Sequence, residues 1–184
     1  MYFSLFIDEL AVKRITDPDL HNLYSFKTGF RFNNLIDNLY GGIEYTITNA
    51  LTFQHFVSTT TFESNQFNLG HYLTDNAKEI YLNLGYRPVR NLKIDLHYTG
   101  AKKGPDHTLL GTEPRTTIEA FTPVVWESDE LGLNFSWQII NDGYLRLGYT
   151  YRNVRGDQTY LDLWTAEYYH GKTGTLDMGL NFGF

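Results

Sequence analysis

The chain has no cysteine among its 184 residues. This absence excludes a disulfide framework, a thiolate metal site and a cysteine nucleophile. Proline is scarce, with only 5 residues, so few positions are barred from a hydrogen-bonded strand. No apolar run reaches the roughly 20 residues that a membrane-spanning helix requires. The sequence therefore predicts neither a disulfide-stapled fold nor a transmembrane helix.

Basic residues are also in the minority, with 15 Lys and Arg against 21 Asp and Glu. The resulting net charge of −6 lacks the dense basic patch that nucleic-acid binding needs. We therefore expect no nucleic-acid partner.

Aromatic residues are abundant, with 14 Tyr, 13 Phe and 3 Trp, and apolar positions alternate with polar ones along most of the chain. In the segment 175–184, for example, Leu176, Met178, Leu180 and Phe182 are separated by polar residues or glycine. A period of two is typical of β-strands with one apolar face. The strands predicted in this way are 1–8, 23–32, 39–48, 78–87, 92–99, 130–139, 144–152 and 175–184.

The connections between these strands alternate between short and long. The short ones are 33–38, 88–91 and 141–143, and the longer ones are 13–21, 49–77, 101–128 and 153–172. Outer-membrane barrels have this arrangement, with short periplasmic turns and long extracellular loops. We therefore predict an all-β fold, an antiparallel up-and-down transmembrane β-barrel, in which 1–184 forms a single domain.

Alternation alone does not decide which face is outside, because a lipocalin-like soluble barrel alternates too. Three features favour a membrane. Aromatic residues lie toward strand ends on the apolar face, as in interfacial girdles: Tyr86, Tyr98, Trp137 and Tyr151. The opposite face carries charges of both signs: Lys27, Arg31, Arg87, Lys93, Arg146, Arg152, Asp8, Glu44, Glu79, Asp95, Glu130 and Asp177. Finally, the last strand ends on Phe184, as in barrels recognised by the outer-membrane assembly machinery. We therefore expect a bacterial outer-membrane protein whose partners are outer-membrane lipid and the barrel assembly machinery.

Four segments resemble Wzi-type capsule assembly proteins, particularly their Bacteroidetes branch. They are residues 69–107, SLFIDEL near the start, 138–153 and 161–184, in the same order as in the family. The resemblance implies a non-enzymatic outer-membrane barrel of more than eight strands that attaches capsular polysaccharide to the cell surface. The resemblance also implies that this chain corresponds to the C-terminal part of such a protein. No signal peptide is visible in MYFSLFIDEL, so we expect either a removed leader or a start within a larger protein.

No constellation of residues points to catalysis. The six histidines have no metal-ligand spacing, and neither a nucleophile elbow nor a phosphate-binding glycine loop occurs. His97 and Asp95 share one strand face and resemble a general-base dyad, but a hydrogen-bond network in the lumen is the favoured interpretation. We expect no catalytic residue, no metal and no cofactor.

Candidate polysaccharide-binding residues lie in two of the long connections. Aromatic faces stack on sugar rings, and lysines pair with the carboxylates of acidic glycans. The candidates are Lys102, Lys103, Trp164, Tyr168, Tyr169, His170 and Lys172. The alternative is that these aromatic residues extend the girdle or pack the loop. The predicted function is attachment of capsular polysaccharide, with a porin-like channel or a small structural eight-stranded barrel as alternatives.

The mixed charges of the polar face also predict how the sheet closes. Burying that many ions in a narrow, dry barrel is expensive unless each is well hydrogen-bonded. We therefore expect a curved sheet that belongs to a wider barrel, in which the strands around Phe3–Ile7 and Leu176–Phe182 form no ladder with each other.

Overall fold

The computed structural model describes residues 1–12, 22–34, 36–54, 62–64, 67–107 and 121–183. Eight strands form the main sheet: β1 (Tyr2–Glu9), β2 (Leu23–Asn33), β3 (Leu39–Thr48), β6 (Ala77–Val89), β7 (Leu92–Lys103), β8 (Trp126–Ile140), β9 (Gly143–Gly156) and β10 (Gly171–Phe182). Between β3 and β6 lies a two-residue pair, β4 (Glu63–Ser64) and β5 (Phe67–Asn68). Between β9 and β10 lie the helix α2 (Gln158–Trp164) and the 3₁₀ turn η2 (Glu167–Tyr169).

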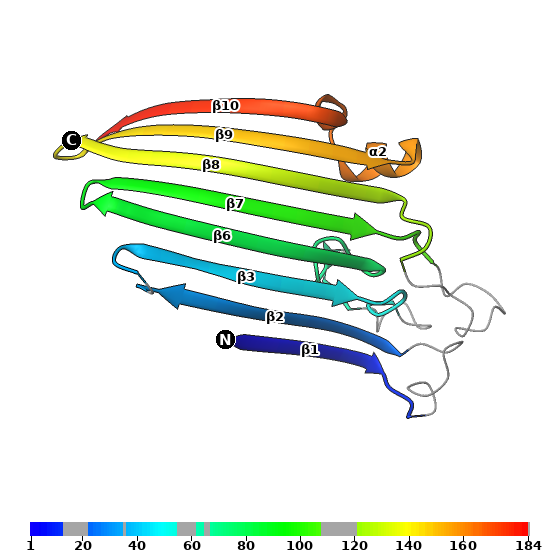
Figure 1. Ribbon diagram of the computed structural model, residues 1–184. Helices are drawn as coiled ribbons and strands as arrows, with labels where there is room; N and C mark the ends of the chain where they lie inside the picture. Colours follow the sequence, from blue (N-terminus) through cyan, green and yellow to red (C-terminus); the bar gives the residue numbers. More distant parts are fainter. Residues whose placement is uncertain (13–21, 35, 55–61, 65–66, 108–120, 184) are drawn as a thin grey trace.

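Strands of the main sheet pair in the order in which they follow one another along the chain, and every pairing is antiparallel (Figure 1). The prediction of an all-β, antiparallel up-and-down fold is therefore confirmed, and each predicted strand is found. The short turns behave as their sequences indicate: Asp142 has a φ of 61°, a left-handed conformation that Asn and Asp tolerate better than most residues.

The sheet is strongly curved but does not close. Within the described residues, β1 pairs only with β2, and β10 pairs only with β9. The two strands lie at opposite edges of the sheet in Figure 1. The expectation that the first and last strands form no ladder is therefore confirmed.

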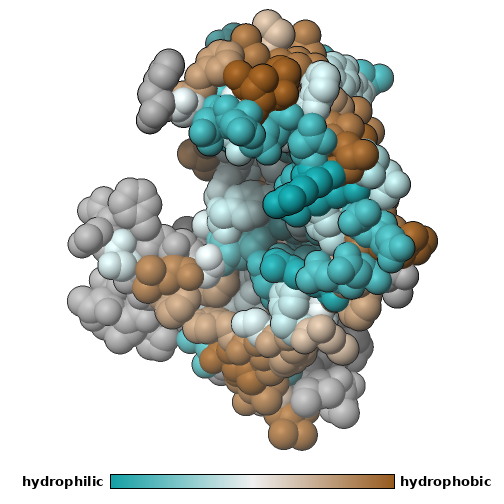
Figure 2. All heavy atoms as spheres, turned by 90° about the vertical axis from the view of Figure 1, so that its left-hand side faces the viewer, coloured by the Kyte–Doolittle hydropathy of each residue, from teal (hydrophilic) through white to brown (hydrophobic). Residues whose placement is uncertain are grey.

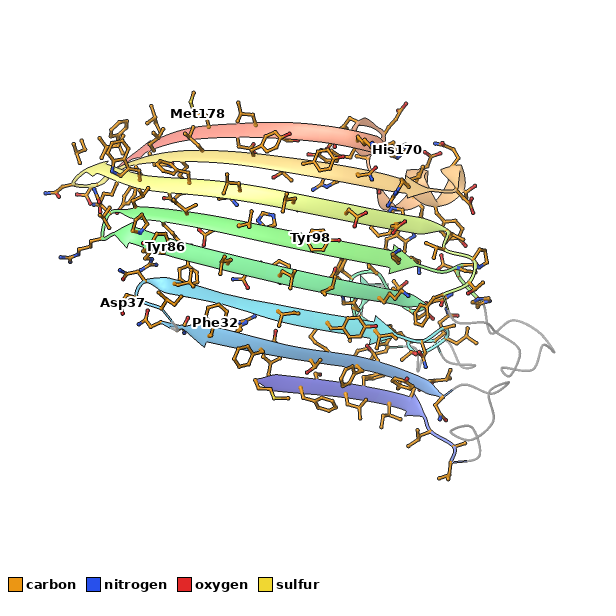
Figure 3. The ribbon with its side chains drawn as sticks, in the orientation of Figure 1. Phe32, Asp37, Tyr86, Tyr98, His170 and Met178 are labelled. Atoms are coloured by element: carbon orange, nitrogen blue, oxygen red, sulfur yellow. The ribbon has the colours of Figure 1, made fainter. Side chains whose placement is uncertain are left out.

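The two faces of the sheet differ in polarity, as the alternation predicts. In Figure 2, which shows the sheet end-on, hydrophilic side chains gather in the hollow and hydrophobic ones lie on the outside. Apolar residues on the outer face stay exposed, including Leu133 at 48% and Met178, which points away from the sheet in Figure 3. On the inner face, ion pairs join neighbouring strands, such as Lys27 with Glu44 at 2.8 Å.

A small hydrophobic core occupies the inner face at the end that carries the long connections. Its buried members are Leu73, Ala77, Ala101, Trp126, Val154 and Leu161. The core joins the strands β6 to β9 to the segment before β6 and to α2. Among the described residues, no helix is both long and apolar enough to cross a membrane.

Candidate functional site

A pocket of about 480 Å³ lies on the inner face beneath the segment that follows α2; we call it the helix pocket. It is lined by Tyr72, Thr99, Ala101, Trp126, Ser128, Glu130, Arg152, Val154, Trp164, Thr165, Ala166 and Tyr169. Strands β7, β8 and β9 form its floor, and residues 164–169 form its cover. Its volume falls in the range typical of small-molecule sites.

The cover is held in place by contacts that begin at the start of α2. The Asp157 amide donates to the Val125 carbonyl at 2.9 Å, and Leu161 inserts into the small core. After the helix, the Trp126 indole donates to the Thr165 hydroxyl at 2.9 Å. The segment that carries Trp164 is therefore fixed by both packing and hydrogen bonds to the end of the sheet where β8 begins.

The floor of the helix pocket carries an ion pair, Arg152 with Glu130, that contacts the rings of Tyr169 and His97. Arg152 makes two hydrogen bonds to the Glu130 carboxylate, one of them from Nε at 2.7 Å. The guanidinium also lies 4.3 Å from the centre of the Tyr169 ring. Nε2 of His97 is 3.5 Å from the Glu130 carboxylate. The imidazole ring covers Gly132, where a Cβ would overlap it.

The Arg152 guanidinium and the Glu130 carboxylate are planar hydrogen-bonding groups that lie beside aromatic rings. Sugars are bound well by this combination, because their hydroxyl groups need hydrogen bonds and their C–H faces stack on aromatic rings. The Trp164 indole nitrogen adds to it, because it is buried and has no hydrogen-bond partner among the described residues. A buried donor without a partner costs about 1–3 kcal/mol, which a ligand oxygen would relieve.

The structure brings some of the predicted candidates together and separates others. Trp164 and Tyr169 line the helix pocket. Tyr168 packs on Tyr169 with ring centres 4.2 Å apart but is 73% exposed, and it does not line the helix pocket. His170 follows in the same turn, where its ring contacts the Thr165 carbonyl at 3.1 Å.

Two candidate lysines lie away from the helix pocket. Lys102 shares the outer face of its strand with Tyr98 and pairs with Glu127 at 2.5 Å. Lys172 is exposed on β10, in register with Asn153. Neither lysine lines the helix pocket with Trp164.

Lys103 requires a correction, because its side chain has 0% exposure and cannot touch a polysaccharide in this structure. Its ammonium donates to the carbonyls of Leu73 and Asp75 at 3.2 and 2.9 Å and pairs with Asp106 at 2.7 Å. The same group lies 5.0 Å from the centre of the Trp164 ring. Lys103 therefore fixes the connection before β6 to the sheet and supports the indole from below.

Beside this lysine, the Asp75 carboxyl is buried and accepts a hydrogen bond from the Gln54 amide at 3.0 Å. Burial raises the pKa of Asp75, and the nearby Lys103 ammonium only partly offsets that effect. The connection before β6 therefore contains a titratable group whose protonation state is coupled to folding.

Sequence reasoning missed two aromatic members of the site. Trp126, Ser128 and Glu130 are alternate residues of β8 and therefore share its polar face. An aromatic residue on that face could have indicated a binding site. Tyr72 gave no such signal, because it lies in an irregular connection. Arg152 and Glu130 were assigned to the polar face but not to a site.

Comparisons with known proteins add no identification. No protein-family model matches the chain, and neither a curated protein nor a solved structure was found to match it. In the part of the chain that the structure describes, no group of three or more His, Asp or Glu side chains has the arrangement of a metal site.

Proposed function

We propose that this chain is a membrane-spanning part of a bacterial outer-membrane β-barrel that holds capsular polysaccharide at the cell surface without catalysing a reaction. The observation that carries the proposal is the contrast between the two faces of the sheet. An exposed apolar outer face suits lipid, whereas a polar inner face with an aromatic pocket suits a hydrated carbohydrate.

The outer face supports the membrane part of the proposal. Large apolar side chains are exposed on all eight strands, far beyond the scattered apolar residues of an ordinary water-soluble surface. Aromatic residues gather on this face near the short turns: Tyr86 lies three residues before the end of β6, and Trp137 three residues before the end of β8 (Figure 3). An aromatic girdle at the membrane boundary is typical of strands that cross a bilayer. Outer-membrane lipid and the barrel assembly machinery would then be partners.

The open edges support a barrel wider than these eight strands. In hydrocarbon, an unpaired strand edge leaves backbone amides and carbonyls without partners, so membrane sheets close. Because β1 and β10 run in opposite directions, an even number of additional antiparallel strands would complete the ring. The resemblance to Wzi-type proteins agrees with such an arrangement.

The helix pocket supports the polysaccharide part of the proposal. Trp164 offers its ring to the apolar side of a sugar and Tyr169 adds aromatic lining, while Arg152 and Glu130 offer a donor and an acceptor to the hydroxyl groups. We infer that the pocket binds a sugar unit of the capsule and that neighbouring exposed residues, Tyr168 among them, contact adjoining units.

A binding experiment tests this function. The purified protein in detergent is titrated calorimetrically with capsular polysaccharide from encapsulated bacteria, and Trp164→Ala is compared with Trp137→Ala. Both changes remove an indole, but Trp137 lies on the outer face, away from the pocket. We expect the first variant to lose binding and the second to retain it, with both showing normal heat-modifiable migration. Equal binding by the two variants would contradict the proposal.

A channel is the second candidate function, because charged and polar residues continue along the inner face beyond the helix pocket. Lys93 and Asp95, for example, pair at 2.9 Å near the short turns. Conductance of the purified protein in planar bilayers distinguishes the two functions: stepwise ion conduction that capsular polysaccharide does not block would favour transport. A small closed barrel of eight strands receives no support from the open sheet.

A further inference from the structure

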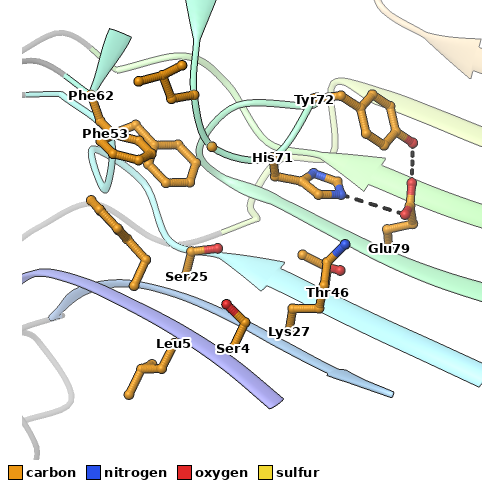
Figure 4. A pocket seen from close by; sticks show the side chains of 13 residues that line it. Ser4, Leu5, Ser25, Lys27, Thr46, Phe53, Phe62, His71, Tyr72 and Glu79 are labelled. Carbon is orange, nitrogen blue, oxygen red and sulfur yellow. Dashed lines mark hydrogen bonds and ion pairs between the residues drawn. The ribbon is translucent and has the colours of Figure 1, made fainter. Parts of the chain in front are cut away.

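A second pocket of about 520 Å³ lies beside the helix pocket on the inner face; we call it the edge pocket (Figure 4). Strands β1, β2, β3 and β6 contribute to it, together with residues of the long connection between β3 and β6. None of the polysaccharide-binding residues expected from the sequence lines it.

One wall of the edge pocket is aromatic. The ring of Phe6 packs against Phe62 and Phe53, with centres 4.7 and 5.3 Å apart. Phe6 comes from β1, whereas Phe53 and Phe62 come from the connection between β3 and β6, and the three rings meet at the same side of the pocket. They form an apolar surface on which the C–H face of a sugar ring can stack.

The facing wall is polar, as Figure 4 shows. Glu79 accepts a hydrogen bond from the Tyr72 hydroxyl and lies 3.6 Å from Nε2 of His71. Lys27 reaches the same space while it pairs with Glu44 on the neighbouring strand. Positive and negative groups are balanced, so the wall favours a ligand rich in hydroxyl groups over a strongly charged one.

Thr46 supplies the observation that points to a ligand. Its side chain lines the edge pocket and is only 2% exposed, yet its hydroxyl has no hydrogen-bond partner among the described residues. Most buried polar groups in proteins are paired, and an orphaned hydroxyl carries a desolvation cost. A ligand hydroxyl bound against Thr46 would complete this pairing.

Tyr72 connects the two pockets, because its side chain lines both of them. Its hydroxyl is fixed by Glu79, while 61% of the residue remains exposed. The ring therefore stands at the boundary between the helix pocket and the edge pocket. The two pockets can be occupied by one continuous ligand that passes over this tyrosine.

We propose that the edge pocket and the helix pocket are successive subsites for a single linear oligosaccharide. The inference rests on the proposed function and extends it, since it assigns a second sugar-binding site and sets a minimum length for the ligand. A sugar in the edge pocket stacks on Phe62 and pairs with the Thr46 hydroxyl, and the chain continues past Tyr72 to Trp164.

The test measures affinity against ligand length. Size-fractionated hydrolysates of capsular polysaccharide and of dextran are titrated into the full chain in detergent by calorimetry. For the wild type we expect affinity to rise with length until both pockets are filled. Thr46→Val and Phe62→Leu each lower affinity roughly tenfold, the equivalent of one lost hydrogen bond or stacking contact, and only for the longer fragments.

Two further variants control for folding. Thr46→Ser keeps the hydroxyl, so its affinity should depend on ligand length as in the wild type. Thr150→Val makes the same chemical change as Thr46→Val on the inner face but outside both pockets, so it should leave affinity unchanged. Affinity that does not depend on length, or equal binding by Thr46→Val and the wild type, would overturn the inference. The proposed function would still be supported in that case if Trp164→Ala no longer bound the short fragments. If no fragment binds the wild type, the proposed function fails and the inference fails with it.

Discussion

Replacing Leu133 by arginine tests the orientation of the whole sheet. Leu133 lies in the middle of β8 on the outer face, between Leu96 of β7 and Tyr149 of β9. If this face meets lipid, arginine near the bilayer midplane costs about 2–4 kcal/mol. That cost lowers the equilibrium constant for folding into a membrane roughly 30- to 700-fold, since each 1.4 kcal/mol is a factor of ten.

The neighbouring position provides the control. Asn134 lies on the inner face, directly opposite Asp95 on β7 and opposite Gly148 on β9, with Asp177 next in the same row on β10. Arginine at 134 would therefore extend between two carboxylates. We expect Asn134→Arg to change the free energy of folding by no more than about 0.5 kcal/mol, as for most surface substitutions.

The assay is reversible urea unfolding in lipid vesicles, followed by tryptophan fluorescence and by heat-modifiable migration in gels. The expected result is a large loss of stability for Leu133→Arg and little change for Asn134→Arg. Equal stabilities would refute the assignment of faces. A water-soluble, folded Leu133→Arg protein in buffer without lipid or detergent would instead favour a soluble barrel.

Three further predictions concern the inner face, the connection before β6 and the sheet edges. Gly132→Ala places a Cβ where the His97 ring lies and should destabilise the protein by about 1–3 kcal/mol, measured as a shift in the urea midpoint. Burial raises the pKa of Asp75, so the folded state binds the carboxyl proton more tightly than the unfolded state. The free energy of unfolding therefore falls as pH rises from the ordinary pKa to the raised one. Asp75→Asn should flatten this part of the stability–pH profile, measured by urea unfolding at a series of pH values. Leu5→Cys combined with Met178→Cys should form no intramolecular disulfide on mild oxidation, because β1 and β10 do not pair.

Each of these predictions has an internal control. Gly179→Ala should be nearly neutral, since a Cβ there meets nothing within 4 Å, and a loss equal to that of Gly132→Ala would contradict the role of His97. An unchanged pH profile in Asp75→Asn would assign the dependence to another group. Met178→Cys with Leu147→Cys, a pair in register on adjacent strands, should cross-link; a Leu5–Met178 cross-link of similar yield would mean that the sheet closes on itself.

Alternation in the sequence was sufficient to predict the sheet because it reflects a local property of extended chains. Successive side chains of a strand point to opposite faces, so Leu131, Leu133 and Phe135 share a side wherever the strand lies. The short turns gave further information, since residues such as Asp142 adopt left-handed conformations more readily than most. The order of strands then followed from the lengths of the connections.

The same alternation already distinguishes Lys102 from Lys103. Adjacent residues of one strand face opposite sides, so the two lysines cannot both contact a single ligand at that position. The structure places Lys102 on the exposed outer face and Lys103 in the buried interior. The alternation predicts a strand that ends at Thr99, which leaves both lysines in a loop, whereas β7 continues to Lys103.

The helix pocket itself could not be predicted, since it depends on contacts between distant segments. Trp164 becomes part of a site only because Leu161 packs on the sheet and Lys103 lies beneath the indole. Tyr72 reaches the same pocket from a connection without regular structure. No local pattern encodes where such segments return to the sheet, because their position is decided by tertiary packing.

The exposure of the ion pairs on the inner face bears on how wide the proposed barrel would be. Lys93 and Asp95 keep 42% and 29% of their side-chain surface exposed, and the Lys27–Glu44 pair is also only partly buried. In a narrow barrel filled by side chains, these ions would lose most of their hydration, and the desolvation penalty would outweigh their mutual attraction unless every remaining hydrogen bond were satisfied. Partial exposure keeps each ion in contact with water and avoids that penalty. The inner face is therefore better suited to a wide, water-filled lumen than to a dry one, and under the proposed function such a lumen would have room for a hydrated polysaccharide chain next to the two pockets.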